Sequence, residues 1–346
     1  MDYFFSDRIS SLQPSAIREI LKAASDPGVI SLAAGNPAPE AFPRAEIAEI
    51  TAEILSRDST AALQYGISEG YEPLRLAVSA LLRRQGIGRD FDRVIITSGA
   101  QQGIDLTTKV LCNEGDVVLC ENPSFIGALN TFRSYNVRLQ GIETEDDGLS
   151  LESLDAALRA EKNVRFLYLI VNFNNPTGLC TSLAKRRAIY DLAKSRGILI
   201  LEDNPYGDLR FAGTDLPSLK SLDEDGVVIY AGSFSKTIAP GLRVGFVCLP
   251  APVAAKITVA KQAADVHTSA LAQIICERFL ARADLEEHFA RLRAIYRRKA
   301  ALMLDNLAAD FPAAVTWTRP EGGLFIWCTL PPETDMLGFC RAAAAA

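Results

Sequence analysis

The residues best suited to chemistry in this sequence lie in one short stretch that follows an apolar, strand-like run. The stretch reads Gly232-Ser233-Phe234-Ser235-Lys236-Thr237-Ile238-Ala239-Pro240-Gly241-Leu242-Arg243-Val244-Gly245. Serine hydroxyls and a guanidinium can bind a phosphate dianion, and glycine lets the backbone approach a ligand closely. The amine of Lys236 is then free to react with an aldehyde. The alternative is a polar loop with a solvated lysine.

Two further loops place polar side chains directly after predicted strands. In Asn174-Asn175-Pro176-Thr177-Gly178, an asparagine amide can donate to a phenolate oxygen on a cofactor ring, although an ordinary Asn-Pro turn explains the same residues. In 201–207, Asp203 ends an apolar strand, where a carboxylate is costly unless it is paired. A protonated ring nitrogen beside Asp203 and a ring oxygen beside Tyr206 would satisfy both side chains. The alternative for Asp203 is a turn cap.

Two more positions suit a ligand that carries a phosphate and an aromatic ring. Ser98 lies between a predicted strand and a helix, where its hydroxyl and the free N–H groups of the helix start could hold an anion. A plain helix cap is the alternative there. Phe125 lies one residue inside the next predicted helix, and its ring could stack on a cofactor or belong to the core. In combination, these loops predict that Lys236 forms a Schiff base with pyridoxal phosphate.

Length and composition limit the classes of protein to consider. The chain has 346 residues, 49% of them apolar and 23% charged, which predicts two domains or one large domain with a satellite. A net charge of −6 argues against nucleic acid as the main partner, and no apolar run reaches the ~20 residues that a membrane span requires. Residues 1–8 lack the features of a secretory signal, so we expect a cytoplasmic protein.

The cysteines and histidines narrow the chemistry further. The 7 cysteines form no CxxC pair and several lie in apolar runs, which predicts buried, reduced thiols and not disulfides or a zinc site. The two histidines, His267 and His288, stand in no metal-binding spacing, so we expect no metal and no histidine-based hydrolase. Lysine therefore remains the best candidate nucleophile.

Alternating strand and helix patterns must position these loops. The expected strands are 94–97, 117–120, 137–142, 165–171, 198–202, 227–231 and 244–249, and the expected helices between them are 101–111, 124–135, 151–160 and 182–196. Strands that are apolar on both faces predict a three-layer α/β/α domain with a mainly parallel sheet. Ligands bind beyond the carboxyl ends of the strands in such domains, which is where the loops above are expected.

The flanking regions predict an N-terminal arm and a smaller α+β domain. Helices are expected at 15–21, 44–57 and 72–85, and a strand at 29–32. Residues 253–309 are helical in composition with a break near 265–269, and strands at 315–317 and 324–328 flank a turn. The expected units are an arm at 1–45 packed with the small domain and the active site, a large cofactor-binding domain at 46–252 and a small domain at 253–346. The closing run of five alanines suggests that this small domain is incomplete.

The combination of motifs resembles the class I/II aminotransferases, the fold-type I pyridoxal-phosphate enzymes, over essentially the whole chain from about residue 8. The resemblance implies that Lys236 is the Schiff-base lysine and that Asp203 is the partner of the pyridine nitrogen. It implies that Asn175 and Tyr206 bind the ring oxygen and that Phe125 stacks on the ring, where many relatives carry tyrosine. The implied phosphate-binding set is Ser98, Gly99, Ala100, Gln101, Ser233, Ser235 and Arg243.

The resemblance also implies a homodimer with active sites built from both chains. Tyr65 matches the tyrosine that reaches the neighbouring subunit's cofactor phosphate, and Gly35 matches a loop glycine near the substrate. The N-terminal region looks most like the 2-aminoadipate/kynurenine aminotransferase branch, which makes Arg18 a candidate substrate contact beside Gly35 and Asn175. The arginine that holds the substrate α-carboxylate in the family is expected beyond the last residue of this sequence.

The implied reaction is a ping-pong transamination from an L-amino acid to a 2-oxo acid, with 2-oxoglutarate as the expected acceptor. The freed amine of Lys236 would move the α-proton, so burial and cationic neighbours must lower its pKa from about 10.4. A β-lyase or decarboxylase of the same fold would share every cofactor residue. The effector-binding half of a transcription regulator is a further alternative, against which the short segment 1–45 and the pI of 5.2 weigh.

Overall fold

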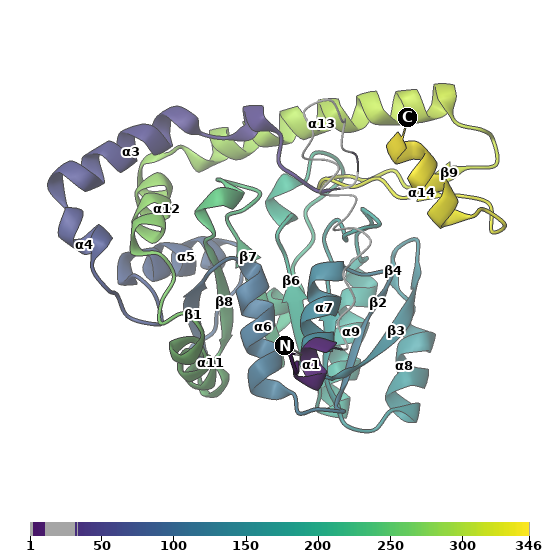
Figure 1. The fold of residues 1–346 in the computed structure, drawn as a ribbon, viewed down its shortest axis with the longest axis horizontal. Helices are drawn as coiled ribbons and strands as arrows, with labels where there is room; N and C mark the ends of the chain where they lie inside the picture. Colours follow the sequence, from purple (N-terminus) through teal and green to yellow (C-terminus); the bar gives the residue numbers. More distant parts are fainter. Residues whose placement is uncertain (1–2, 11–31, 33, 346) are drawn as a thin grey trace.

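An eight-stranded mixed sheet forms the centre of this computed structural model, which describes residues 3–10, 32 and 34–345 (Figure 1). The strands are β1 (Asp92–Thr97), β2 (Val117–Asn122), β3 (Arg138–Glu145), β4 (Gly148–Leu149), β5 (Val164–Leu169), β6 (Leu199–Asp203), β7 (Val228–Ser233) and β8 (Gly245–Pro250). Their order is β1-β8-β7-β6-β5-β2-β3-β4. Parallel pairing joins β7, β6, β5, β2 and β3 in turn. Strand β8 is antiparallel to both its neighbours, and β4 is antiparallel to β3. The predicted mainly parallel sheet is confirmed, and only the short β4 was not predicted.

Alternate residues of the central strands face two different layers of helices, as a repeat of two residues requires. On one face, Phe166 and Leu201 belong to a core with α6 (Ala100–Leu111), α7 (Ile126–Ser134) and α11 (Ala251–Ala264). On the other face, Leu167 and Ile200 belong to a core with α8 (Leu151–Ala160), α9 (Leu183–Arg196) and α10 (Leu219–Leu222). The two layers confirm the predicted α/β/α fold.

A third core closes the β1–β8 edge of the sheet. Here Ile96 and Tyr230 pack with α3 (Arg44–Arg57), α4 (Ser59–Leu63), α5 (Glu72–Arg84) and α12 (Ala270–Arg282). The predicted break near 265–269 is confirmed, because α11 ends at Ala264 and α12 begins at Ala270. Both α11 and α12 share a core with strands of the sheet, and the expected unit boundary after residue 252 stays a prediction.

The long helix α13 (Leu285–Asp310) runs across one end of the sheet and leads to the C-terminal elements (Figure 1). There β9 (Thr316–Trp317) pairs with β10 (Cys328–Thr329), and α14 (Met336–Ala345) follows. The predicted strand at 324–328 is wrong for most of its length, because only Cys328 enters the ladder. The preceding segment instead bonds to the chain after β6, since the backbone N–H groups of Phe211 and Ala212 both donate to the Glu321 carbonyl.

The N-terminal arm contacts α13 where the structure describes it. Arg291 donates to the carbonyls of Glu40 and Ala41, and the hydroxyl of Tyr296 accepts from the Ala38 backbone N–H. The remaining short helices are α1 (Asp7–Ser10), η1 (Pro39–Ala41), η2 (Gly207–Leu209) and η3 (Pro240–Leu242). The predicted helix at 15–21 and all but Leu32 of the predicted strand at 29–32 lie outside the described residues. Among the described helices, none has the length and apolar character to cross a membrane. The expected cytoplasmic location stays a prediction.

Arg186 on α9 ties the loop after β5 to the body of the domain. Its side chain is fully buried, and its guanidinium donates to the carbonyls of Val171, Thr181 and Pro217 at 2.8–2.9 Å. It also donates to the Asn172 side chain at 2.7 Å. Because Val171 and Asn172 lead directly into the Asn174–Gly178 loop, this one cation fixes the approach to that loop.

We predict that Arg186→Met lowers the free energy of unfolding by about 4 kcal/mol, because it leaves several buried acceptors without donors. Urea titration followed by circular dichroism measures the change in midpoint. The matched control is Arg187→Met, since Arg187 is the next residue of the same helix but is exposed. Equal midpoints for the two variants would contradict the assignment.

Candidate active site

A pocket of about 260 Å³ opens at the carboxyl ends of the parallel strands. This volume is close to the lower end of the range for small-molecule sites, about 300–1,000 Å³. The pocket brings together eleven of the predicted site residues, namely Gly35, Ala100, Gln101, Phe125, Asn175, Asp203, Tyr206, Ser233, Ser235, Lys236 and Arg243. Ser98, Gly99 and Tyr65 do not line it, and Arg18 lies outside the described residues.

Asp203 is the last residue of β6 and is almost fully buried. Its Oδ2 accepts a hydrogen bond of 2.8 Å from the Tyr168 hydroxyl, whereas its Oδ1 has no hydrogen-bond partner among the described residues. Burial raises the pKa of Asp203, the hydrogen bond from Tyr168 offsets part of this rise, and the resulting pKa is about 7. A buried carboxylate oxygen without a donor is costly. The free Oδ1 therefore fits a bound molecule with a protonated ring nitrogen, as pyridoxal phosphate has.

The two asparagines of the loop after β5 have different tasks. The Asn174 amide donates to the buried carboxyl of Glu121 at 2.8 Å, so it braces the loop. The Asn175 amide faces the pocket and lies 3.5 Å from the Tyr206 hydroxyl. Burial, followed by the charge of Asp203, raises the pKa of Tyr206, so this hydroxyl stays protonated and can donate. The structure thus places the Asn175 and Tyr206 donors together, as the ring-oxygen assignment requires.

Lys236 extends into the pocket from the loop that follows β7. Its Nζ donates to the Gly35 carbonyl at 2.8 Å, which links the lysine loop to the N-terminal arm. Burial, and then the neighbouring charge of Arg243, lower the pKa of Lys236. The predicted direction of this shift is confirmed. A lower pKa leaves more of the amine neutral near pH 7, which suits a nucleophile and base.

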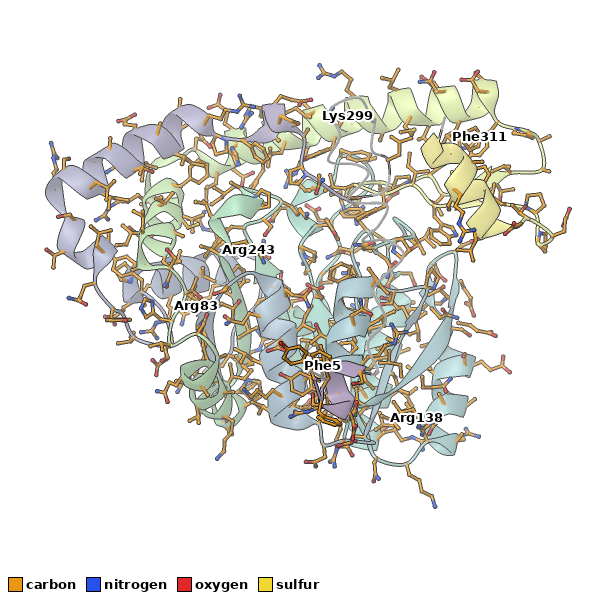
Figure 2. All side chains as sticks on the ribbon, viewed as in Figure 1. Phe5, Arg83, Arg138, Arg243, Lys299 and Phe311 are labelled. Atoms are coloured by element: carbon orange, nitrogen blue, oxygen red, sulfur yellow. The ribbon has the colours of Figure 1, made fainter. Side chains whose placement is uncertain are left out.

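Arg243 and two serines line one part of the pocket, where their side chains can donate to an anion. The Ser233 hydroxyl accepts from the Ser235 backbone N–H at 3.0 Å and lies 2.9 Å from the Ser235 hydroxyl. Arg243 is exposed and lies near the N-terminal end of α6, far from Arg138 on β3 (Figure 2). Gly99 has φ +78°, and a Cβ there would lie 2.5 Å from the Arg243 guanidinium. This position therefore favours glycine, because a positive φ strains any residue that carries a Cβ, and the small residue also lets the arginine approach the backbone.

The Ser98 hydroxyl is directed away from the pocket. It donates to Asp265 at 2.9 Å and lies 3.1 Å from the Thr268 hydroxyl. The fully buried Lys261 donates to Asp265 and Thr268 as well as to Gln102, so one polar network joins the start of α6 to the α11–α12 junction. This network braces the start of α6, where the pocket residues Ala100 and Gln101 lie. Direct phosphate binding by Ser98 stays a prediction.

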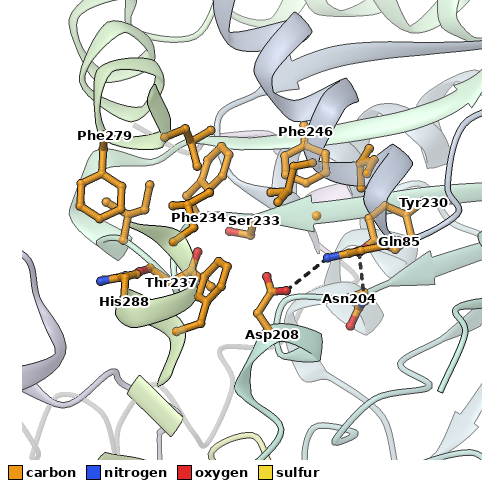
Figure 3. Close-up of a pocket in the computed structure, with 17 residues that line it drawn as sticks. Gln85, Asn204, Asp208, Tyr230, Ser233, Phe234, Thr237, Phe246, Phe279 and His288 are labelled. Atoms are coloured by element: carbon orange, nitrogen blue, oxygen red, sulfur yellow. Dashed lines mark hydrogen bonds between the residues drawn. The ribbon is translucent and has the colours of Figure 1, made fainter. Parts of the chain in front are cut away.

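A second cavity, of only about 20 Å³, lies behind the lysine loop (Figure 3). This volume holds about one water molecule. The Gln85 amide donates to Asp208 on its wall at 3.3 Å. His288 also lines the cavity, and its Nε2 lies 2.6 Å from the Thr237 carbonyl in the lysine loop. The His288 contact therefore ties the lysine loop to α13.

Two residues that matter to the site, Phe325 and Tyr168, were not predicted as site residues. Phe325 lines the pocket and packs edge-on against Tyr206, with ring centroids 5.6 Å apart. Its ring leaves no room for a Cβ at Gly35, which gives this glycine a steric reason. Because the sequence predicted a strand over 324–328, Phe325 was not expected to line the pocket. Tyr168 lies in an apolar strand, where the sequence gives no sign of a role in the site. The register of β5 and β6 brings it to Asp203.

Comparisons with known proteins agree with this geometry. The family model for aminotransferase class I and II matches residues 27–344. The chain is 41% identical over 342 residues to a 2-aminoadipate transaminase of Thermus thermophilus, covering 98% of this chain and 84% of the relative. It is 38% identical over 342 residues to aromatic-amino-acid aminotransferase 1 of Thermococcus litoralis, covering 97% and 82%.

A solved structure shows the same arrangement of the backbone. The kynurenine aminotransferase of Pyrococcus horikoshii, crystallised with PMP, kynurenine substrate and product, superposes with a TM-score of 0.93 at 36% identity. The match covers 97% of this chain and 84% of that one. A similarity of this extent and identity covers all the elements that build the pocket.

We predict that reductive methylation of the cofactor-free protein labels Lys236 with a pH midpoint below the ordinary lysine value of about 10.4. Burial and the charge of Arg243 both favour the neutral, reactive amine. Arg243→Gln should move the midpoint upward, and mass spectrometry of the peptides measures it. Exposed Lys256 in the same sample controls for reagent efficiency. A Lys236 midpoint that Arg243→Gln leaves unchanged would contradict the charge effect.

Proposed function

Because this chain belongs to the aminotransferase class I and II family, whose members transfer amino groups with pyridoxal phosphate, we propose that it acts on L-amino acids with long side chains. One observation carries the assignment of the site. The Lys236 amine and the unpartnered Oδ1 of Asp203 line the same pocket, so a covalent anchor and a ring-nitrogen acceptor are available to one cofactor. The 2-oxo acid acceptor that we propose is 2-oxoglutarate.

The described residues fit pyridoxal phosphate group by group. Asp203 would accept from the ring nitrogen, Asn175 and Tyr206 would donate to the ring oxygen, and Phe125 would cover the ring. The phosphate would be held by Ser233, Ser235, Arg243 and the N–H groups at the start of α6, where the helix dipole favours an anion. When bound, the cofactor withdraws electrons from the substrate α-carbon.

Lys236 performs the proton transfer in this proposal. Its lowered pKa keeps a share of the amine neutral, so Nζ can accept the substrate α-proton and then donate it to a different atom. The Gly35 carbonyl, 2.8 Å from Nζ, orients the amine. The Tyr206 hydroxyl, which its raised pKa keeps protonated, and the Asn175 amide would act as donors that hold the reacting group in place relative to the lysine.

The donor preference follows from the side chains next to the lysine. Phe325 and Ile104 line the pocket, the Phe325 ring lies against Gly35, and the Gly35 carbonyl is 2.8 Å from the Lys236 Nζ. An aromatic ring beside a glycine suits a long or aromatic substrate side chain. The similar proteins named above act on 2-aminoadipate, aromatic amino acids and kynurenine, which share long side chains. The substrate role of Arg18 stays a prediction, since this residue lies outside the described chain.

A donor screen tests this proposal. Tyrosine, phenylalanine, kynurenine and 2-aminoadipate should give glutamate from 2-oxoglutarate at a higher kcat/KM than alanine. A parallel reaction without acceptor separates amino transfer from lyase or decarboxylase chemistry, because only the latter continues past one turnover without a 2-oxo acid. Preference for alanine would refute the donor class, and multiple turnovers without acceptor would refute the reaction class.

We also propose that the chain forms a two-fold homodimer with Tyr65 of each chain completing the other chain's site. Tyr65 is 83% exposed, and its neighbours Leu63 and Ile67 are 70% and 55% exposed. Val266, at the α11–α12 junction, is 48% exposed, and the Tyr65 ring packs against neighbouring His267. Apolar side chains gathered in this way are typical of a surface that a second protein covers.

Lys236→Ala should lower kcat by at least about 10³-fold, because both the covalent anchor and the base are lost. Asp203→Asn should lower kcat by about 10²-fold or more, since a neutral amide no longer stabilises a protonated ring nitrogen. Steady-state kinetics and cofactor absorbance measure the two effects separately. Lys256→Ala, at an exposed position of α11, is the control and should match the wild type. Wild-type turnover by Lys236→Ala would remove the proposed role.

Mixing two inactive variants tests the shared site. Tyr65→Ala should be at least about tenfold less active than the wild type, and Lys236→Ala should be inactive. After co-refolding in equal amounts, half of the dimers are mixed, and each mixed dimer holds one intact site. Activity should therefore recover to about a quarter of the wild-type value. No recovery, with mixed dimers shown by native mass spectrometry, would place Tyr65 and Lys236 in the same chain's site.

A further inference from the structure

Tyr168 and Asp203 are brought together by the register of two neighbouring parallel strands. In the β5–β6 ladder, Tyr168 is opposite Leu201. Asp203 is two residues beyond Leu201, and residues two apart point to the same face of a strand. The two side chains therefore meet diagonally on one face of the sheet, where the Tyr168 hydroxyl donates to Oδ2 of Asp203 at 2.8 Å.

The Tyr168 hydroxyl has little freedom to move. The residue is fully buried, and its ring packs edge-on against Phe132, with centroids 5.4 Å apart. Burial and the adjacent Asp203 carboxylate raise its pKa far above the ordinary value for tyrosine, so the hydroxyl remains a donor at every physiological pH. A rigid donor at one oxygen leaves the other carboxylate oxygen as the acceptor for anything in the pocket.

The neighbouring buried carboxylate, Glu202, shows that this free oxygen is specific to Asp203. Glu202 points to the opposite face, where its Oε1 accepts from the Leu219 backbone N–H at 3.0 Å and its Oε2 from the Lys220 backbone N–H at 2.8 Å. Both of its oxygens are thus used inside the protein. In Asp203, one oxygen is used in this way and the other is buried without a donor at the pocket.

We propose that Tyr168 is a positioning residue for amino transfer: its hydrogen bond to Oδ2 orients the Asp203 carboxylate and presents Oδ1 to the cofactor ring nitrogen. This inference rests on the role proposed above for Asp203. A hydrogen bond from Tyr168 stabilises the ionised carboxylate against the cost of burial. The ionised carboxylate in turn holds the proton on the ring nitrogen, so loss of the Tyr168 hydroxyl moves that proton toward Asp203.

The test compares Tyr168→Phe with Tyr190→Phe. Tyr190 is also a buried tyrosine that donates to an aspartate, at 2.7 Å to Asp225, but it lies outside the pocket. In the cofactor-free protein, infrared titration follows the carboxyl band that Asp203→Asn removes. Its pKa should be about 7 in the wild type and in Tyr190→Phe, and clearly higher in Tyr168→Phe.

Two measurements with pyridoxal phosphate complete the test. The ¹⁵N signal of ring-labelled cofactor should show a protonated nitrogen in the wild type and in Tyr190→Phe, and a shift toward neutral pyridine in Tyr168→Phe. The dissociation constant should rise about tenfold in Tyr168→Phe, as expected for one lost hydrogen bond to a charged group. Circular dichroism verifies folding, and Tyr168→Leu replaces Tyr168→Phe in each measurement if the latter does not fold.

The outcomes separate this inference from the proposed function. An unchanged Asp203 titration and an unchanged ¹⁵N signal in a folded Tyr168 variant would overturn the positioning role while leaving Asp203 in place. Wild-type turnover and ¹⁵N signal in Asp203→Asn would remove the role of Asp203, and with it this inference. A shift in Tyr168→Phe alone, absent from Tyr190→Phe, supports the assignment, because general loss of packing would affect both variants.

Discussion

A carboxylate buried at the end of a strand sets the main constraint on this molecule. The interior tolerates a charge on Asp203 only with donors nearby, and the described chain supplies a single donor. The parallel sheet makes this arrangement possible, because adjacent strands end together and their last side chains converge. The unsatisfied oxygen destabilises the folded protein without ligand. A ligand that donates to this oxygen removes that cost, and the cost removed adds to the binding free energy.

The rest of the pocket is built from loops that are each braced from outside. Arg186 holds the chain before Asn174, Glu121 holds Asn174, and Lys261 with Asp265 holds the start of α6. These groups do not line the pocket, yet they fix the backbone that does. Such bracing limits the movement of Asn175, Lys236 and the α6 N-terminus. Catalysis by positioned groups depends on this limit, because misplacement by about 1 Å can cost about 10²-fold in rate.

Sequence reasoning was most successful where chemistry and local pattern coincide. The loops after β5, β6 and β7 could be predicted because apolar strands end in residues that are costly unless they bind something. Phe325 and Tyr168 could not be predicted, because each lies in an apolar run where its type suits the core. Their roles depend on contacts with distant parts of the chain, at Gly35 and at Asp203. The orientation of Ser98 also depends on a distant residue, Asp265, which its own turn sequence does not reveal.

The junction between α11 and α12 has a consequence for how the molecule responds to dilution. Asp265 and Thr268 belong to the network that holds the start of α6, while neighbouring Val266 and His267 lie at the surface with Tyr65. With the two-fold dimer proposed above, the same few residues contribute to two equilibria, cofactor binding and subunit association. Where the partner's Tyr65 strengthens cofactor binding, linkage requires that the cofactor strengthen subunit association by the same factor. Apparent cofactor affinity would then depend on protein concentration, so a dilute enzyme would lose its cofactor more readily than a concentrated one.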